Sequence, residues 1–192
     1  MGELIMLFVG AALVNNFLLS RFLGICPFLG VTRELKAALS MGAAVTFVML
    51  VTGLVVWPLQ HYVLDPLGLG YLQTVAFILI IAVLVQFLEM VIRKYSPALY
   101  EAFGIYLPLI TTNCAILGLA LLVVDEGYTL GQTLVFAVGS AVGYTLAMVM
   151  MAGIRQELEF ADVPPAFRGT AVSLLIAGLL ALGFLGFNGL GA

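Results

Sequence analysis

Long apolar runs, interrupted only briefly by charged or turn-forming residues, dominate this chain of 192 residues. A helix needs about 20 consecutive apolar residues to cross the hydrocarbon core of a bilayer. The runs predict six membrane-spanning segments, approximately at residues 4–30, 37–58, 71–92, 99–124, 130–153 and 169–190. We therefore expect an all-α, polytopic membrane protein that forms a single transmembrane domain over residues 1–192, with only short loops between its helices.

The composition excludes the common soluble classes. Apolar residues make up 64% of the chain and charged residues 9%, whereas a soluble domain has roughly 45–50% and 25%, respectively. Seven Lys and Arg residues cannot form an extended phosphate-binding surface, so we expect membrane lipid and not nucleic acid as a partner. No basic residue precedes the first apolar run, which is therefore expected to be a retained helix and not a cleaved signal peptide.

The distribution of basic residues predicts the orientation of the chain in the membrane. Basic residues in short loops mark the cytoplasmic side. All seven lie in the first, third or fifth predicted loop, or at a helix end beside one: Arg21, Arg33, Lys36, Arg93, Lys94, Arg155 and Arg168. Both termini, together with Asp65 and Asp125, are therefore expected on the outer side.

Two short motifs recur in the two halves of the chain. Cys26-Pro27-Phe28-Leu29-Gly30 and Cys114-Ala115-Ile116-Leu117-Gly118 share Cys, a bulky apolar residue, Leu and Gly at equal spacing. Residues 42–45 resemble residues 139–142, and an aromatic residue follows two positions after each segment. The second pair is offset by nine residues more than the first, which we attribute to a longer intervening loop.

We interpret the two halves, approximately residues 1–97 and 98–192, as repeats of three spans each. Because three is an odd number, the second half enters the membrane from the opposite side, and the repeats are inverted. Inverted repeats with broken helices place a working site between the halves, near the middle of the bilayer. The same pattern is typical of a secondary transporter.

Each cysteine motif lies in a span that is too long for one straight helix, the first and the fourth. Pro27 cannot continue a preceding helix but is favoured at the start of a new one, so Cys26 is expected to be an N-cap. In the second half we expect Pro108 to interrupt the helix and residues 111–113 to cap a new helix near Cys114. The positive end of a helix dipole favours thiolate over thiol, so both breaks are candidate positions for a sulfur-ligated metal centre.

A shared site for Cys26 and Cys114 has two requirements. The cysteines would lie at different depths on straight helices, so the backbone near Gly24 and residues 104–108 must be unwound and covered by protein. A two-iron cluster takes four thiolates, and His61, in the outer loop, is expected to be out of reach. Another chain, such as a related protein in the opposite orientation, would supply two ligands. Alternatively, the cysteines are small buried hydrophobes or form a disulfide with each other.

Several other polar residues lie within the predicted spans. Such groups are candidates for an ion path: Asn15, Asn16, Arg21, Gln86 and Glu89. They also have structural interpretations, since Glu89 stands one helical turn before Arg93, the asparagines can bond to neighbouring helices, and Arg21 can extend toward the interface. We expect small residues of the last span to allow close helix packing: Gly178, Gly183 and Gly186.

Four segments closely resemble one subunit type of bacterial Rnf complexes, the RnfA type, within the Rnf/Nqr membrane subunit family. They are Leu13-Val14-Asn15-Asn16-Phe17, Phe22-Leu23-Gly24-Ile25-Cys26-Pro27-Phe28-Leu29-Gly30, Leu107-Pro108-Leu109-Ile110-Thr111-Thr112-Asn113-Cys114-Ala115 and Asp162-Val163-Pro164-Pro165-Ala166-Phe167-Arg168-Gly169. The E subunit of the sodium-translocating NADH:quinone oxidoreductase shares some of these features. Asn15-Asn16 and the Cys-Pro pair favour the Rnf side.

The resemblance implies a component of a complex in the bacterial inner membrane that couples electron transfer between ferredoxin and NAD to sodium or proton translocation. It implies no activity for the chain alone. It further implies a [2Fe-2S] cluster, with Cys26 and Cys114 as two ligands and two cysteines from the inverted, homologous Rnf E subunit. The Rnf B, C, D and G subunits, which carry flavins and iron–sulfur clusters, are the other implied partners. Competing interpretations are the E subunit of the quinone reductase, a secondary transporter without a redox centre, and a scaffold.

Overall fold

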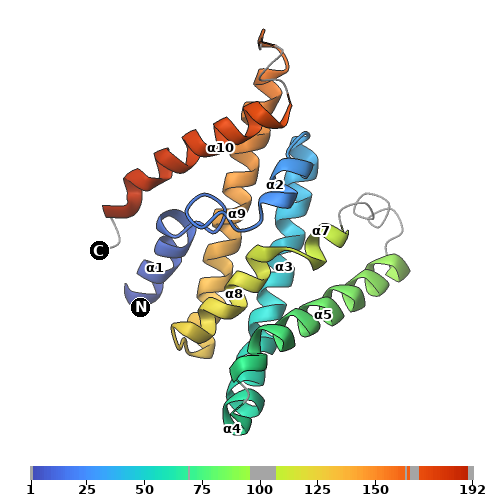
Figure 1. The fold of residues 1–192 in the computed structure, drawn as a ribbon, viewed down its shortest axis with the longest axis vertical. Coiled ribbons are helices and arrows are strands. Elements are labelled where there is room, and N and C mark those ends of the chain that lie inside the picture. The colour runs from blue at the N-terminus through green and yellow to red at the C-terminus, as the bar shows by residue number, and fades with distance from the viewer. Residues whose placement is uncertain (1, 69, 96–106, 163, 165–168, 190–192) are drawn as a thin grey trace.

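The structure is a computed structural model that describes residues 2–68, 70–95, 107–162, 164 and 169–189. Every regular element in this part of the chain is helical, as the apolar runs predict (Figure 1). Four stretches are long and apolar enough to cross a membrane: Leu35–Leu67, Gly70–Val91, Pro108–Asp125 and Leu130–Leu158. Gly2–Val14 and Thr170–Leu185 are shorter apolar helices.

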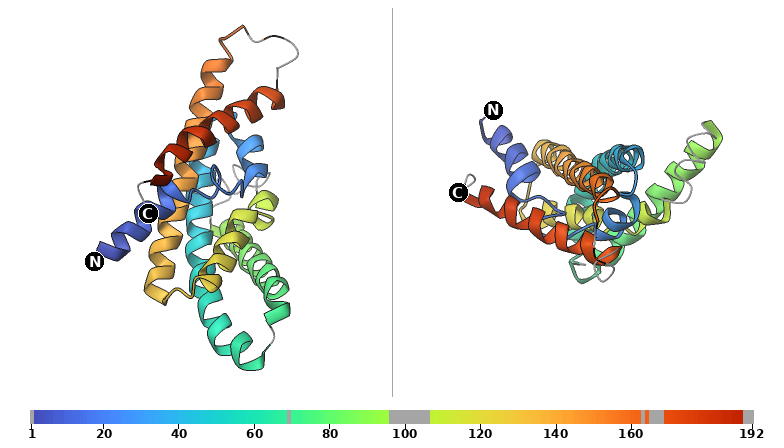
Figure 2. Two further views of the ribbon diagram at one scale, coloured as in Figure 1. Left: turned by 60° about the vertical axis from the view of Figure 1, so that its left-hand side comes forward. Right: turned by 90° about the horizontal axis from the view of Figure 1, so that it is seen from above.

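Two long antiparallel helices, α3 (Leu35–Leu59) and α9 (Leu130–Leu158), form the centre of the molecule (Figures 1 and 2). Small residues let them approach closely, since a methyl group added at Gly53 would lie 3.2 Å from the side chain of Thr133. At one end of the pair, Trp57 Nε1 donates a hydrogen bond to the Tyr128 carbonyl (2.8 Å). At the other end, Arg155 Nη1 donates to Thr32 Oγ1 (3.0 Å).

The two spans that are too long for a straight helix are both interrupted. The first consists of α1 (Gly2–Val9), a π-helical turn η1 (Gly10–Val14), an unwound segment at residues 15–24, and α2 (Ile25–Val31). The described part of the fourth consists of α7 (Leu107–Thr111) and α8 (Cys114–Asp125). The two breaks lie beside the central pair (Figure 1).

The chain after α3 differs from the prediction. We expected a loop over residues 59–70, but helical structure continues through η2 (Gln60–Leu64) and α4 (Asp65–Leu67). Pro58 lies inside α3 without ending it, because the backbone continues as a π-turn. Gln60 Nε2 donates to Asp65 Oδ1 (2.7 Å), and Gly68, with a φ of +64°, ends the helix.

Two peripheral helices, α5 (Gln73–Tyr95) and α10 (Thr170–Leu185), diverge from the central pair, α10 toward the upper left and α5 toward the right of Figure 1. The short helices η3 (Gly70–Leu72) and η5 (Gly186–Gly189) flank them. Large apolar side chains are exposed on both, including Leu79 and Phe87 of α5 and Leu182 of α10. In a membrane such faces contact lipid or other helices.

The glycines that allow close packing are not the predicted ones. Methyl groups added at Gly178, Gly183 and Gly186 would meet nothing within 4 Å, because α10 packs on the chain through its opposite face. Close approach occurs instead at Gly139 and Gly143 of α9, where added methyl groups would collide with the backbone of α1 and η1. This G-x-x-x-G spacing is present in the sequence, but many other small residues obscure it.

Candidate functional site

A single buried side chain, Asn16, organises the unwound segment of the first break. Its Oδ1 accepts hydrogen bonds from the backbone nitrogens of Leu18 (3.0 Å) and Leu19 (3.3 Å). Its Nδ2 donates to the carbonyls of Ala12 (3.2 Å) and Gly143 (2.7 Å). Asn16 therefore satisfies backbone groups that a helix would have paired and ties the segment to α9, as the packing interpretation predicts.

Two residues with left-handed backbone conformation turn the chain toward α8. They are Phe22, with a φ of +54°, and Gly24, with a φ of +85°. Only glycine fits at the second position, because an added methyl group would lie 2.7 Å from Cε2 of Tyr144 and 3.2 Å from Oδ1 of Asn113. The left-handed conformation is unusual for a residue as large as Phe22, and the sequence carries no signal for it.

The turn brings the two cysteine motifs together. The backbone nitrogen of Gly24 donates a hydrogen bond to Sγ of Cys114, at 2.8 Å. Cys26 lies two residues further along the same stretch of chain, in the first turn of α2. The juxtaposition that a shared site requires is therefore present, although the two motifs are far apart in the sequence.

The start of α2 corrects one prediction. Gly24, and not Cys26, is the N-cap, and the helix begins at Ile25. Pro27 is its third residue. A proline is tolerated there because the first backbone N–H groups of a helix have no partner within it. Cys26 consequently lies inside the first helical turn, where the helix dipole still favours a thiolate.

The second break is shorter and is capped by a side chain. Cys114 is the first residue of α8, and Oδ1 of the N-cap Asn113 accepts a hydrogen bond from the nitrogen of Ala115 (3.0 Å). This cap confirms the predicted role of residues 111–113. The interruption itself lies at residues 112–113, whereas we predicted it at Pro108, which lies near the start of α7 and accepts a hydrogen bond from the Thr112 hydroxyl (2.9 Å). Residues 104–106 lie outside the described part of the chain.

The two thiols differ in exposure. Both cysteines are free, Cys26 being exposed and Cys114 partly buried, so they form no disulfide with each other. A cavity of about 340 Å³ opens between α5 and α8 beside Cys114, and its polar lining includes Thr112 and Asn113. Cys26 is not among the residues that line this cavity.

The donor set of this chain is incomplete for a metal. Among the described residues, no group of three or more His, Cys, Asp or Glu side chains could hold an ion. His61 lies in η2, beyond the end of α3 farthest from α2, where its ring stacks on Trp57 with centroids 5.5 Å apart. Two thiols at neighbouring helix starts fit half of a four-thiolate centre, and the other half must come from another chain.

Sequence reasoning missed Tyr144 as a residue of this site. Its side chain is fully buried in α9, and its ring lies against Gly24. Its hydroxyl interacts electrostatically with both thiols, and within the described residues this hydroxyl and Nδ2 of Asn113 satisfy no geometric hydrogen-bond criterion. The available signal was a tyrosine in the middle of an apolar run, where a hydroxyl needs a partner.

The remaining polar candidates lie away from the cysteines. Asn15 is exposed at the end of η1, and on α5 Gln86 is exposed and Glu89 partly buried. Arg21 is exposed and interacts electrostatically with Tyr128. Burial and, to a lesser extent, Glu126 raise the pKa of Tyr128, whereas Arg21 lowers it. The structure does not bring these residues together.

Comparison with known proteins agrees with these features. A family model described as "Rnf-Nqr subunit, membrane protein" matches residues 4–191. A component of the ion-translocating oxidoreductase complex of Syntrophotalea carbinolica is 60% identical over 190 residues, which cover 99% of this chain and 98% of the relative. The corresponding component of the Na⁺-translocating ferredoxin:NAD⁺ oxidoreductase complex of Acetobacterium woodii is 56% identical over 97% of both chains. The ion-translocating oxidoreductase component of Serratia proteamaculans is 55% identical, covering 99% of this chain and 98% of the relative. All three relatives carry the letter A in the naming of their complexes. The chain therefore belongs to the Rnf-Nqr family of membrane subunits, as its sequence motifs predict.

Proposed function

We propose that this chain is an electron-carrying component of an ion-translocating ferredoxin:NAD oxidoreductase complex. In this proposal Cys26 and Cys114 supply two ligands of a [2Fe-2S] cluster, and an inverted homologous subunit, Rnf E, supplies the other two. The observation that carries the proposal is the hydrogen bond from Gly24 N–H to Cys114 Sγ, which joins the two cysteine-bearing helix starts. The names of the relatives supply the reaction and the complex.

The residues present fit such a group in several respects. When bound, a two-iron cluster accepts and releases one electron at a time, with a potential set partly by hydrogen bonds to its sulfur ligands. Both thiols lie at helix starts, where free N–H groups and the helix dipole favour thiolate. Gly24 N–H already donates to one of them. The exposure of Cys26 leaves it open to a neighbouring chain.

A carrier within the membrane also suits the proposed function physically. The hydrocarbon core is about 30 Å thick, which is too far for one efficient electron transfer step. The unwound segment can persist there because its backbone groups are paired within the chain: Ser20 N donates to Asn16 O (2.9 Å), and Leu23 N donates to Phe17 O (2.8 Å).

We further propose that the halves are inverted repeats of three spans, which makes six. In each half an interrupted helix precedes a long central helix, which a diverging helix follows: α1 to α2, α3 and α5, then α7 to α8, α9 and α10. The central helices are antiparallel, as inversion requires (Figure 2). Most of the nine extra residues of the second half lie in α8, which is longer than α2, and not in the longer loop that we predicted.

The proposed orientation places the end of the central pair that carries Arg33, Lys36 and Arg155 in the cytoplasm. Asp65 and Asp125 belong to elements at the opposite end, and the ends of η1 and α10 lie near each other. Arg21 departs from this pattern, since it interacts with Tyr128, which lies at the opposite end from Arg155. Sodium or proton translocation, the Rnf B, C, D and G partners, and an ion path through Asn15, Asn16 or Glu89 remain predictions.

The experiment compares the assembled complex with Cys26→Ala and Cys114→Ala variants. Electron paramagnetic resonance after reduction is expected to lose one two-iron signal in each variant, together with ferredoxin-to-NAD electron transfer. Ser140→Ala, which removes a buried hydroxyl elsewhere in α9, is the matched control and is expected to keep both. A signal and activity that survive both cysteine substitutions would favour the transporter or scaffold interpretation.

A further inference from the structure

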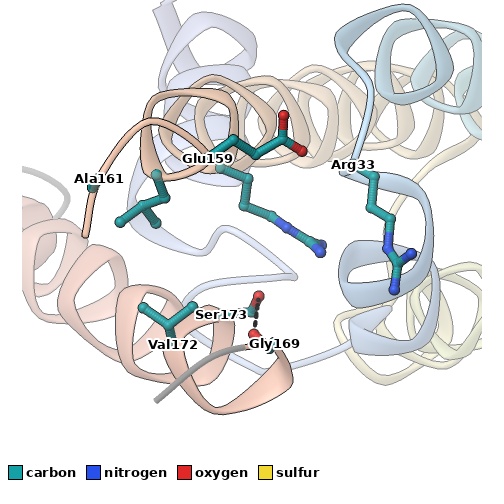
Figure 3. Close-up of a pocket in the computed structure, with 8 residues that line it drawn as sticks. Arg33, Glu159, Ala161, Gly169, Val172 and Ser173 are labelled. Carbon is teal, nitrogen blue, oxygen red and sulfur yellow. Dashed lines mark hydrogen bonds between the residues drawn. The ribbon is translucent and has the colours of Figure 1, made fainter. Parts of the chain in front are cut away.

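A second cavity, of about 540 Å³, lies at the basic end of the central pair, between the α2–α3 linker, the end of α9 and the start of α10 (Figure 3). Its lining is Arg33, Arg155, Leu158, Glu159, Ala161, Gly169, Val172 and Ser173. None of these residues lines the cavity at Cys114. The proposed electron-transfer function therefore does not account for it.

Two guanidinium groups face this cavity from different elements. Arg155 is held in place because its Nη1 donates to the Leu29 carbonyl (2.9 Å) and to Thr32 Oγ1 (3.0 Å). Arg33 is exposed, and no ion pair with a described carboxylate neutralises it. The two positive groups are close enough for their electrostatic interaction to be unfavourable. A bound anion would convert this repulsion into two attractive, charge-assisted contacts.

The start of α10 adds further donors on the other side of the cavity. Its N-cap, Gly169, has a φ of +87° and makes no side-chain cap. The Ser173 hydroxyl donates to the Gly169 carbonyl (3.2 Å), as the dashed line in Figure 3 shows. No side chain therefore caps the first N–H groups of this helix, and the positive end of its dipole is directed toward the cavity.

We propose that this cavity binds the phosphodiester head group of an anionic phospholipid between Arg33, Arg155 and the start of α10. Two arginines and Glu159 give the lining a net charge of +1, which matches a singly charged phosphodiester better than a doubly charged free phosphate. Leu158, Ala161 and Val172 provide apolar surface for the glycerol portion. The proposed cytoplasmic location of this end fits, because anionic lipids enrich that leaflet and basic pockets between helices bind their head groups.

The test uses the full chain in its complex, purified in detergent, with native mass spectrometry after addition of phosphatidylglycerol, diacylglycerol or inorganic phosphate. Arg33→Gln is expected to reduce phosphatidylglycerol retention about tenfold, since it removes one charge-assisted contact. Lys36→Gln is the matched control. It removes the same charge from the exposed start of α3, outside the cavity lining, and should leave retention unchanged. Glu159→Gln should increase retention.

The arms of this experiment separate the sources of the anion. Diacylglycerol, which lacks the phosphate, should bind without dependence on Arg33. Arg33-dependent binding of inorganic phosphate, with no phosphatidylglycerol adduct, would overturn the lipid and identify a free-phosphate site. An equal loss of lipid in the Arg33 and Lys36 variants, or no loss in either, would overturn the site itself. Arg33→Lys should restore part of the retention, which excludes misfolding as the cause of the loss.

Discussion

The two helix breaks solve the same physical problem in different ways. The first, at residues 15–24, is long, contains two left-handed residues and ends beside an exposed cysteine. The second, at residues 112–113, is short, is capped by Asn113 and places its cysteine in a partly buried position. The contact between them is the hydrogen bond from Gly24 N–H to Cys114 Sγ.

This difference indicates a division of labour between the breaks. A buried or lipid-covered backbone must pair its polar groups, so the long break needs its own network around Asn16. The short break needs only one cap. The short break thus fixes Cys114, while the long break carries Cys26 outward, where a neighbouring chain could approach it.

The strongest way to disturb the comparison is Gly24→Ala. The new methyl group meets Tyr144 and Asn113, and the φ of +85° is unfavourable for alanine, so we expect destabilisation of about 2–5 kcal/mol from overpacking and backbone strain combined. Thermal unfolding of the purified complex in detergent measures the loss. Gly30→Ala is the control, because Gly30 lies in α2 with nothing within 4 Å of an added methyl group. Equal stability of the two variants would contradict the close contact at Gly24.

The next largest effect is expected from Asn16→Ala. The substitution leaves buried backbone donors and acceptors of the long break and α9 unpaired, at about 1–3 kcal/mol for each unsatisfied group before relaxation. The adjacent Asn15→Ala, at an exposed position, should change the unfolding temperature little. Hydrogen exchange of the Leu18 and Leu19 amides should accelerate in the first variant only, and similar exchange in both would count against the network.

Removal of the cap at the short break should have a smaller effect. Asn113→Ala deletes the bond to Ala115 N and should destabilise α8 by about 1 kcal/mol. Thr112→Ala, which changes an exposed neighbour, is the control. Local hydrogen exchange at the first turn of α8 is the measurement. An unchanged exchange rate in the Asn113 variant would show that the break is held by other contacts.

The smallest effect on stability is expected from Tyr144→Phe. The hydroxyl is buried and meets no geometric hydrogen-bond criterion, so its removal should change the free energy of unfolding by less than about 1 kcal/mol. If this hydroxyl faces the proposed metal centre, the midpoint potential in a redox titration should shift even though stability does not. Phe136→Leu, at an aromatic residue elsewhere in α9, serves as the control for the potential. Identical potentials in all three proteins would remove Tyr144 from the site.

The sequence predicted much of the fold because its signals are local. Apolar runs are sufficient for the long helices, and residues 111–113 carry their own capping chemistry. The contact of Gly24 with Cys114 was not predictable in detail, because it depends on the left-handed Phe22 and on tertiary packing against Tyr144. Similarly, composition could not distinguish the packed Gly139 and Gly143 from the open glycines of α10, since both helices are rich in small residues.

The most direct test of the central claim is the iron and acid-labile sulfide content of this chain purified together with its inverted partner and no other component of the complex. The account predicts about two irons and two sulfides per pair, none with this chain alone, and none when either Cys26 or Cys114 is replaced by alanine. A pair that assembles without iron, or one that keeps its iron after both replacements, would contradict it.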